Sequence, residues 1–163
     1  MNTRVKHICF SSMFAAIIFV VTRFIQIPIP LGYLNFGNCI ILLSCCLLPC
    51  RYAVAAGALG SALADLTSFP LYTVPTLIIK SVFPLVFCVM LKLKIKNSYA
   101  KHIIAAAVST LIPLVGYTVT GMILYGGFAA GITQAPGLVA EYFANLVIFS
   151  IMLTQTVKRN IKL

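Results

Sequence analysis

Four charged side chains interrupt apolar stretches of this sequence where no aqueous loop is expected: Arg23, Asp65, Lys80 and Glu141. They comprise both acids of the chain and two of its twelve bases. A charge at the centre of a membrane helix costs about 2.5–3.5 kcal/mol on the insertion scale, so intramembrane charges mark functional sites or buried pairs. Charged groups fixed in an apolar wall are suited to orienting a small polar molecule.

Polar and aromatic neighbours share helix faces with these charges. Tyr72, Thr76 and Lys80 recur every four residues and therefore lie along one face of a helix. Glu141 and Asn145 have the same spacing and share a face in the same way. The predicted substrate-binding set is Arg23, Tyr33, Asn35, Asp65, Tyr72, Thr76, Lys80, Tyr117, Gly121, Glu141 and Asn145.

The residue types in this set favour a flat ligand. Tyr33, Tyr72 and Tyr117 offer rings for stacking, and Gly121 lets a planar molecule approach the backbone closely. Lys80 and Arg23 are expected to receive an anionic or carbonyl group.

A structural interpretation of the same charges stays open. Lys80 with Asp65, and Arg23 with Glu141, are also suited to forming interhelical ion pairs that only hold a bundle together.

The composition excludes a soluble globular protein. Of 163 residues, 61% are hydrophobic and 9% are charged, with a mean hydropathy of +1.07, whereas soluble domains carry roughly 25% charged residues. A net charge of +10 in so apolar a chain fits the basic loops of a membrane protein rather than nucleic-acid binding. No glycine-rich Walker sequence is present, so this chain is not expected to hydrolyse nucleotide itself.

Apolar segments of the required length predict an all-α integral membrane protein. A spanning helix needs about 20 mostly apolar residues, within a range of roughly 17–25. The second and third segments are short and are separated by Pro49 and Arg51. We predict one six-helix transmembrane domain covering residues 1–163, with spans at 8–27, 37–49, 52–66, 72–91, 102–125 and 136–157.

The positions of the bases predict the orientation. Ten of the twelve lie before the first segment, after the second, after the fourth and at the C-terminus, whereas connections 27–36, 67–71 and 126–135 carry no charge. The positive-inside rule then places both termini in the cytoplasm, with the bases near anionic lipid headgroups. We expect a multi-pass protein of a prokaryotic cell membrane. Either uncharged loop, 27–37 or 126–136, is a candidate lid over an outward-facing cavity.

Cysteine and histidine give no sign of a metal centre. The six cysteines lie within or at the ends of apolar segments and form no CxxC pair. Small buried apolar side chains are the expected role for them. No metal and no cofactor are expected.

Small residues recur along the first segment. Ser11 with Ala15, and Ser12 with Ala16, are four apart, a pattern that lets membrane helices pack closely. Internal packing and a docking surface for a partner subunit are both compatible with it.

Three runs of sequence, 32–38 (GYLNFGN), 52–66 (YAVAAGALGSALADL) and 68–80 (SFPLYTVPTLIIK), resemble the substrate-binding S component of energy-coupling factor (ECF) vitamin transporters. The resemblance implies a six-helix subunit that captures a vitamin or vitamin precursor from outside. It also implies a transmembrane coupling subunit and two cytoplasmic ATPases, and a docking role for Ser11, Ser12, Ala15 and Ala16. Asn38 stands where the family often has Asp.

We therefore expect a transport subunit rather than an enzyme. Its ligand is expected to be a flat heteroaromatic compound of the pyridoxine, pyrimidine, flavin or queuosine-precursor class. Two other functions stay open. In a stand-alone carrier coupled to protons or ions, Asp65 and Glu141 would titrate. A structural or assembly subunit would need neither pocket nor ligand.

Overall fold

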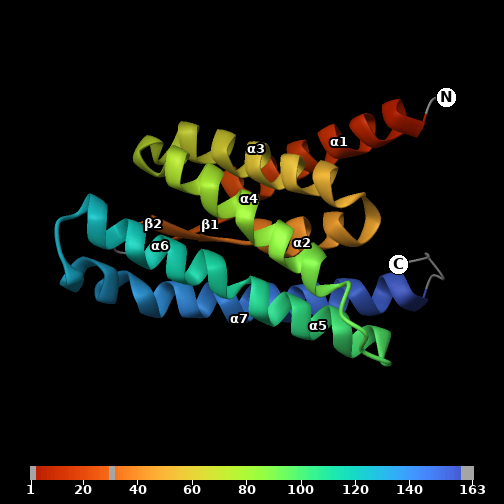
Figure 1. Ribbon diagram of the computed structural model, residues 1–163. Coiled ribbons are helices and arrows are strands. Elements are labelled where there is room, and N and C mark those ends of the chain that lie inside the picture. Colours follow the sequence, from red (N-terminus) through yellow and green to blue (C-terminus); the bar gives the residue numbers. More distant parts are fainter. Residues whose placement is uncertain (1–2, 30–31, 159–163) are drawn as a thin grey trace.

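The computed structural model describes residues 3–29 and 32–158. Its helices lie side by side in an elongated bundle. The first helix begins, and the last helix ends, at the same end of the molecule (Figure 1). In chain order the elements are α1 (Thr3–Phe24), β1 (Gln26–Ile29), β2 (Gly32–Asn35), α2 (Gly37–Leu47), α3 (Cys50–Ser68), the 3-10 helix η1 (Pro70–Tyr72), α4 (Thr73–Met90), α5 (Ser98–Ser109), α6 (Leu111–Leu124) and α7 (Phe128–Lys158).

Four helical stretches are long and apolar enough to cross a membrane. They are α1, η1 with α4, α5 with α6, and the 29 residues Phe128–Thr156 of α7. The 19-residue α3 is not among them, because Arg51 and Asp65 lower its mean hydropathy, and α2 has only 11 residues. The protein is thus a mostly helical membrane protein, and the count of six spans stays a prediction.

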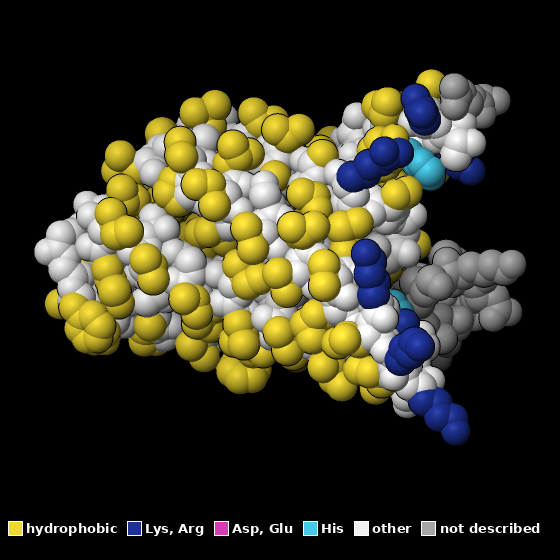
Figure 2. Space-filling model, in the orientation of Figure 1, with side chains coloured by type: hydrophobic (Ala, Val, Ile, Leu, Met, Phe, Trp, Pro, Cys, Tyr) yellow, Lys and Arg dark blue, Asp and Glu magenta, His cyan; other side chains and the backbone are white. Residues whose placement is uncertain are grey.

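Aromatic and branched side chains fill the centre of the bundle. Phe83 and Phe87 of α4 are fully buried, and Phe87 meets Phe149 of α7 edge to face, with ring centroids 5.9 Å apart. Ile18 of α1 and Leu42 of α2 complete the same cluster. The outward faces carry exposed hydrophobic residues, as a lipid-facing surface requires (Figure 2).

Close packing of α1 on α3 depends on small residues. A Cβ added at Gly60 would lie 2.6 Å from the carbonyl oxygen of Ala15, and the Ser11 hydroxyl donates to the carbonyl of Tyr52 at 2.8 Å. Ser12 and Ala16 are exposed on the other side of α1. The two small-residue pairs therefore separate, one packing inside the bundle and the other facing outward.

The prediction of an all-α chain was wrong at one place. Strands β1 and β2 form an antiparallel hairpin in which Gln26 pairs with Asn35 and Pro28 pairs with Tyr33. This segment had been assigned to an uncharged loop. Proline cannot donate to a strand ladder, but an edge strand tolerates it, and a two-stranded hairpin has only edges. Positions 30 and 31 of the predicted lid lie outside the described residues.

The other predicted lid, 126–136, was also wrong as a loop. Only a tight turn separates α6 from α7, with Gly126 at φ +73°, a conformation that glycine adopts without strain. Helix α7 begins at Phe128 and continues through Pro136. A proline often starts a helix, but it is also tolerated inside membrane helices, where its neighbours satisfy the freed carbonyl.

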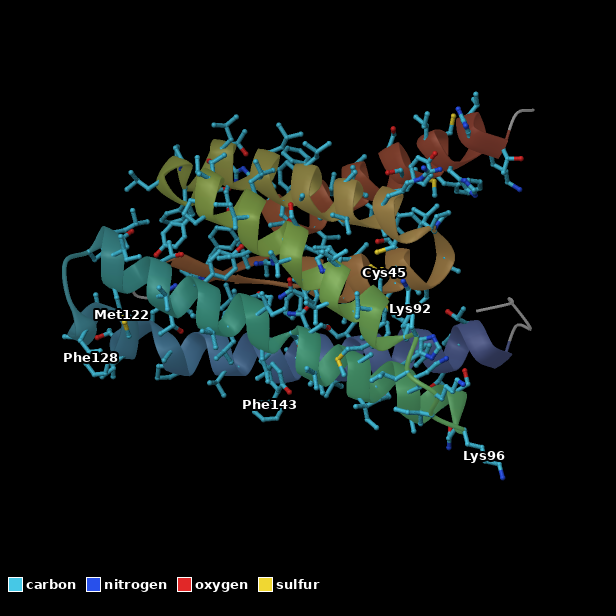
Figure 3. The ribbon with its side chains drawn as sticks, in the orientation of Figure 1. Cys45, Lys92, Lys96, Met122, Phe128 and Phe143 are labelled. Carbon is cyan, nitrogen blue, oxygen red and sulfur yellow. The ribbon has the colours of Figure 1, made fainter. Side chains whose placement is uncertain are left out.

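Basic side chains gather at the end of the bundle where α1 begins and α7 ends (Figure 2). Arg51, Lys92 and Lys96 are exposed, and Figure 3 shows Lys92 and Lys96 at this end, with Met122 and Phe128 at the opposite one. The distribution agrees with a cytoplasmic location for the basic end, which stays a prediction.

Candidate binding site

A cavity with about 360 Å³ of empty space, partly open to the surface, lies among the hairpin, the α3–η1 connection, α6 and α7. Strand β2, just before α2, contributes Tyr33 and Asn35 to the lining, and the 3-10 helix η1 contributes its last residue, Tyr72. The lining residues are Tyr33, Asn35, Asp65, Phe69, Tyr72, Tyr117, Gln134, Leu138 and Glu141.

Asp65, in the last turn of α3, is held by hydroxyl groups. The phenol of Tyr33 donates to its Oδ1, and the hydroxyl of Thr76 donates to its Oδ2. Thr76 Oγ1 also lies 2.9 Å from the phenol oxygen of Tyr117. Three elements besides α3 therefore orient this buried carboxyl group through direct hydrogen bonds or one intermediate hydroxyl.

The phenol of Tyr33 is a hydrogen-bond donor to Asp65 that stays protonated at neutral pH. Burial raises its pKa, and the neighbouring carboxyl group of Asp65 raises it further. The phenol therefore keeps its proton at neutral pH and can donate it to the carboxylate oxygen.

Glu141 belongs to a second buried polar group, in which Asn38 is the central residue. The Asn38 amide donates to Glu141 Oε1 at 2.9 Å and accepts from the ammonium of Lys80. The Asn35 amide approaches the same Oε1 at 3.4 Å. Lys80 is 1% exposed, so its charge reaches Glu141 through a neutral amide rather than through a direct ion pair.

The side chain of Asn145 forms hydrogen bonds with backbone groups of three elements. Its amide nitrogen donates to the carbonyl oxygens of Asn35 and Glu141, both at 2.9 Å, and its oxygen accepts from the N–H of Cys39 at 3.0 Å. Cys39 is in the first turn of α2, where N–H groups have no intrahelical partner. The side chain is fully buried and joins α7 to the hairpin and to the start of α2.

Aromatic rings form much of the remaining wall. Tyr33 and Phe69 have centroids 5.6 Å apart, and Tyr72 and Tyr117 have centroids 6.2 Å apart. The Tyr72 phenol donates to Gln134 Oε1 at 3.4 Å. Four rings, from β2, the α3–η1 connection, η1 and α6, thus face a small space that also holds carboxyl and amide groups.

The structure brings most of the predicted set together. Six members line the cavity, Thr76 is bonded to the lining residue Asp65, and Lys80 is bonded to Asn38, which in turn contacts Glu141. Gly121 lies beside Gln134, whose oxygen would be 2.5 Å from an added Cβ. Arg23 is not in the lining, and its guanidinium lies over the ring of Phe24, 5.7 Å from the centroid.

The two ion pairs considered from the sequence are not formed. Among the described residues, Asp65 is bonded to hydroxyl groups and Glu141 to amides, and no salt bridge joins either acid to Lys80 or Arg23.

Sequence reasoning missed four residues of the site: Asn38, Phe69, Gln134 and Leu138. Gln134, Leu138 and Glu141 follow a spacing of four and then three, the period of one helix face. Starting the last helix at Pro136 concealed this signal, because Gln134 then fell in a loop. Asn38 had been noted only as a departure from a family pattern, and its bonds to Lys80 and Glu141 depend on tertiary contacts.

These features define a class: a membrane-embedded helical protein with a partly open cavity lined by aromatic rings, carboxyl groups and amides. The profile of the family described as "ECF-type riboflavin transporter, S component" matches residues 2–159. The chain therefore belongs to this family, a transporter family rather than an enzyme family.

Two further comparisons also cover most of the chain. A solved structure, described as the S component of a bacterial ECF transporter, superimposes with a TM-score of 0.73 at 24% identity, over 99% of this chain and 100% of that one, and so shows the same fold. A protein of Pyrococcus woesei, described as an "uncharacterized protein in gap 3'region", is 32% identical over 130 residues, 78% of this chain and 81% of the relative.

Proposed function

We propose that this chain captures a flat, vitamin-like heteroaromatic compound from outside the cell and delivers it inward as the substrate-binding subunit of an ECF-type importer. The single observation that carries the proposal is the cavity, in which four aromatic rings surround oriented carboxyl and amide groups. Ligand sites combine apolar walls with a few fixed polar groups in this way.

Riboflavin is the first ligand to test, because the matching family bears its name. The empty space of about 360 Å³ includes volume open to the surface. Pyridoxine, pyrimidine and queuosine-precursor compounds are the other members of the proposed class.

The proposed partners are a transmembrane coupling subunit and two cytoplasmic ATPases. Ser12 and Ala16 support a docking surface on α1, because they are exposed small residues one turn apart, a pattern that favours close helix packing in lipid. Ser11 and Ala15 are engaged inside the bundle. The proposed orientation has both termini and the basic end in the cytoplasm.

A stand-alone carrier coupled to protons or ions is the second candidate. The observation in its favour is that Asp65 and Glu141 are both buried, each 5% exposed, and buried membrane carboxyl groups are typical of such carriers.

Uptake measurements distinguish the two candidates. If the chain works as proposed, radiolabelled vitamin accumulates in proteoliposomes only when the coupling subunit, the ATPases and ATP are all present. Accumulation by the chain alone, driven by a pH gradient, would instead support the carrier. A thermal-shift screen of the detergent-purified chain against vitamins and nucleobases identifies the ligand for this assay.

A further inference from the structure

Four of the six cysteines gather in the half of the bundle that ends in the basic side chains. Cys45 and Cys46 lie in the last turn of α2, Cys50 begins α3, and Cys88 lies in the last turn of α4. Figure 3 shows Cys45 and Lys92 in this half of the molecule. All four cysteines are free thiols, and none belongs to the described lining of the cavity. They therefore form a group separate from the candidate binding site.

Cys88 is the central thiol of this group. The thiols of Cys45 and Cys50 both donate hydrogen bonds to its sulfur, and the charge of Lys92 acts on Cys88 and on Cys50. Hydrogen bonds to a sulfur and a neighbouring ammonium both stabilise the thiolate, which is the nucleophilic form of cysteine. Cys88 is therefore suited to attacking a disulfide.

Cys50 is the partner that is both adjacent and accessible. Cys50 and Cys88 are half-buried, whereas Cys45 is 8% exposed and packs in the central cluster. Helix α3 leads away from the basic end and α4 returns to it (Figure 1), which brings the first residue of α3 beside the last turn of α4. Among residues 3–29 and 32–158, no group of three or more His, Cys, Asp or Glu side chains could hold a metal ion, so the geometry favours thiol chemistry over metal binding.

We propose that Cys50 and Cys88 form a reversible disulfide that joins the start of α3 to the end of α4, with a small-molecule disulfide as the oxidant. The Cys88 thiolate attacks one sulfur of the reagent, and the other half of the reagent leaves as a thiolate that takes up the proton released by Cys88. Cys50 then loses its proton and attacks the Cys88 sulfur, and the second half leaves as a thiol. Two protein thiols are thereby oxidised to one disulfide, and the reagent is reduced to two thiols.

The bond is suited to a transient modification rather than to a permanent staple. Disulfides in the cytoplasm are usually transient, and the basic end is proposed to face the cytoplasm, where small thiols reverse the reaction. The closed loop contains all of α3 and most of α4, so the oxidised chain is expected to unfold at a higher temperature. The Tyr52 carbonyl accepts from Ser11 of α1, so the modified end also includes the α1–α3 contact. No step involves the vitamin, and the inference is independent of the proposed function.

The test counts free thiols in the full chain purified in detergent. Cys9 is exposed on α1 and would react by itself, so the measurement uses Cys9→Ser, which keeps the other five thiols. The protein is equilibrated with reduced or oxidised glutathione as the probe, denatured and labelled with N-ethylmaleimide, and the intact mass gives the number of labels. We expect five labels after reduced glutathione and three, without added glutathione, after the oxidised form. The oxidised chain should also unfold at least about 5 °C higher.

Two further substitutions in the same chain test the assigned roles. Adding Cys50→Ser is expected to stop the reaction at the glutathione adduct of Cys88 and to abolish the rise in the unfolding midpoint. Adding Cys88→Ser is expected to leave all remaining thiols free, and either variant alone suffices if the other does not fold. Five labels under both conditions would overturn the inference. Loss of two thiols without an adduct in the Cys50→Ser chain would overturn it as well, because another cysteine would then close the bond.

Discussion

At the scale of single residues, the site depends on neutral side chains that each bridge two other buried polar groups. Asn38 lies between Lys80 and Glu141, and Thr76 lies between Asp65 and Tyr117. Direct buried ion pairs lose much of their attraction to desolvation, and an intervening amide or hydroxyl satisfies both partners without joining them. Removing one member of such a chain leaves another buried and unsatisfied.

Replacing Lys80 by alanine is expected to abolish vitamin binding while the protein still inserts and folds. Without the ammonium, Asn38 loses its donor, and Glu141 loses the positive charge that offsets its own. Asn38 and Glu141 are then free to leave their places beside the cavity, and we expect the affinity for the vitamin to fall at least about a hundredfold. Titration with the identified vitamin measures it, and Lys92→Ala, at the exposed basic end, is the control. Unchanged affinity in purified Lys80→Ala would remove Lys80 and Asn38 from the site.

Asn145→Leu is expected to lower the stability of the whole protein. The leucine has a similar size but removes the side-chain partner of the Cys39 N–H and of the Asn35 carbonyl oxygen, whereas the Glu141 carbonyl keeps its bond within α7. Each buried unsatisfied group costs about 1–3 kcal/mol.

Thermal unfolding in detergent measures this effect, and we expect a fall in the midpoint of roughly 5–15 °C. Gln155→Leu on the exposed face of α7 is the matched control. Equal midpoints for the two variants would show that Asn145 does not join these elements.

At the scale of elements, the hairpin and the start of α7 complete the cavity, and both were assigned to loops from the sequence. The prolines of the hairpin and Pro136 carried strong loop signals, yet tertiary context overrode them in both places. The helix faces were predictable, because the period of four that joins Tyr72, Thr76 and Lys80 survives folding. Contacts between elements, such as that of Asn38 with Glu141, depend on packing that no local pattern contains.

The α1–α3 contact is a test of packing between elements. Gly60→Ala is expected to destabilise the protein by about 1–3 kcal/mol, because the new methyl group would meet the backbone oxygen of Ala15 at 2.6 Å. In the matched variant Gly127→Ala, nothing lies within 4 Å of the added Cβ. Thermal unfolding of both proteins measures the difference, and a Gly60→Ala midpoint at or above that of Gly127→Ala would contradict the close contact.

The exposed face of α1 is expected to serve assembly rather than folding. The double variant Ser12→Leu with Ala16→Leu should keep vitamin affinity within about twofold, because neither residue touches the cavity. Bulky side chains at a close helix contact prevent the approach that small residues permit. Co-purification of the coupling subunit and ATP-dependent uptake should therefore fall at least about tenfold.

Val20→Leu, on an exposed position of the same helix, is the control for that experiment. Full uptake by the double variant would place the docking surface elsewhere.

At the scale of the whole molecule, the mean hydropathy indicates a membrane protein, and the net charge of +10 reflects bases that lie mostly outside the apolar segments. The bases gather at one end of the bundle (Figure 2), where they are suited to setting orientation. The only two acids lie in the cavity lining. Class, approximate segments and most lining residues were predictable, because hydropathy and charge position are strong local signals in a membrane protein.

Binding of a vitamin in the cavity is the central claim. The most direct measurement is the thermal midpoint of the detergent-purified chain with and without riboflavin and the other vitamins of the class. A ligand at 100 times its Kd adds about 2.7 kcal/mol, so we predict a rise of roughly 5–10 °C for one of them. That rise should vanish in Tyr117→Leu. No rise with any vitamin, or an equal rise in Tyr117→Leu, would contradict the account.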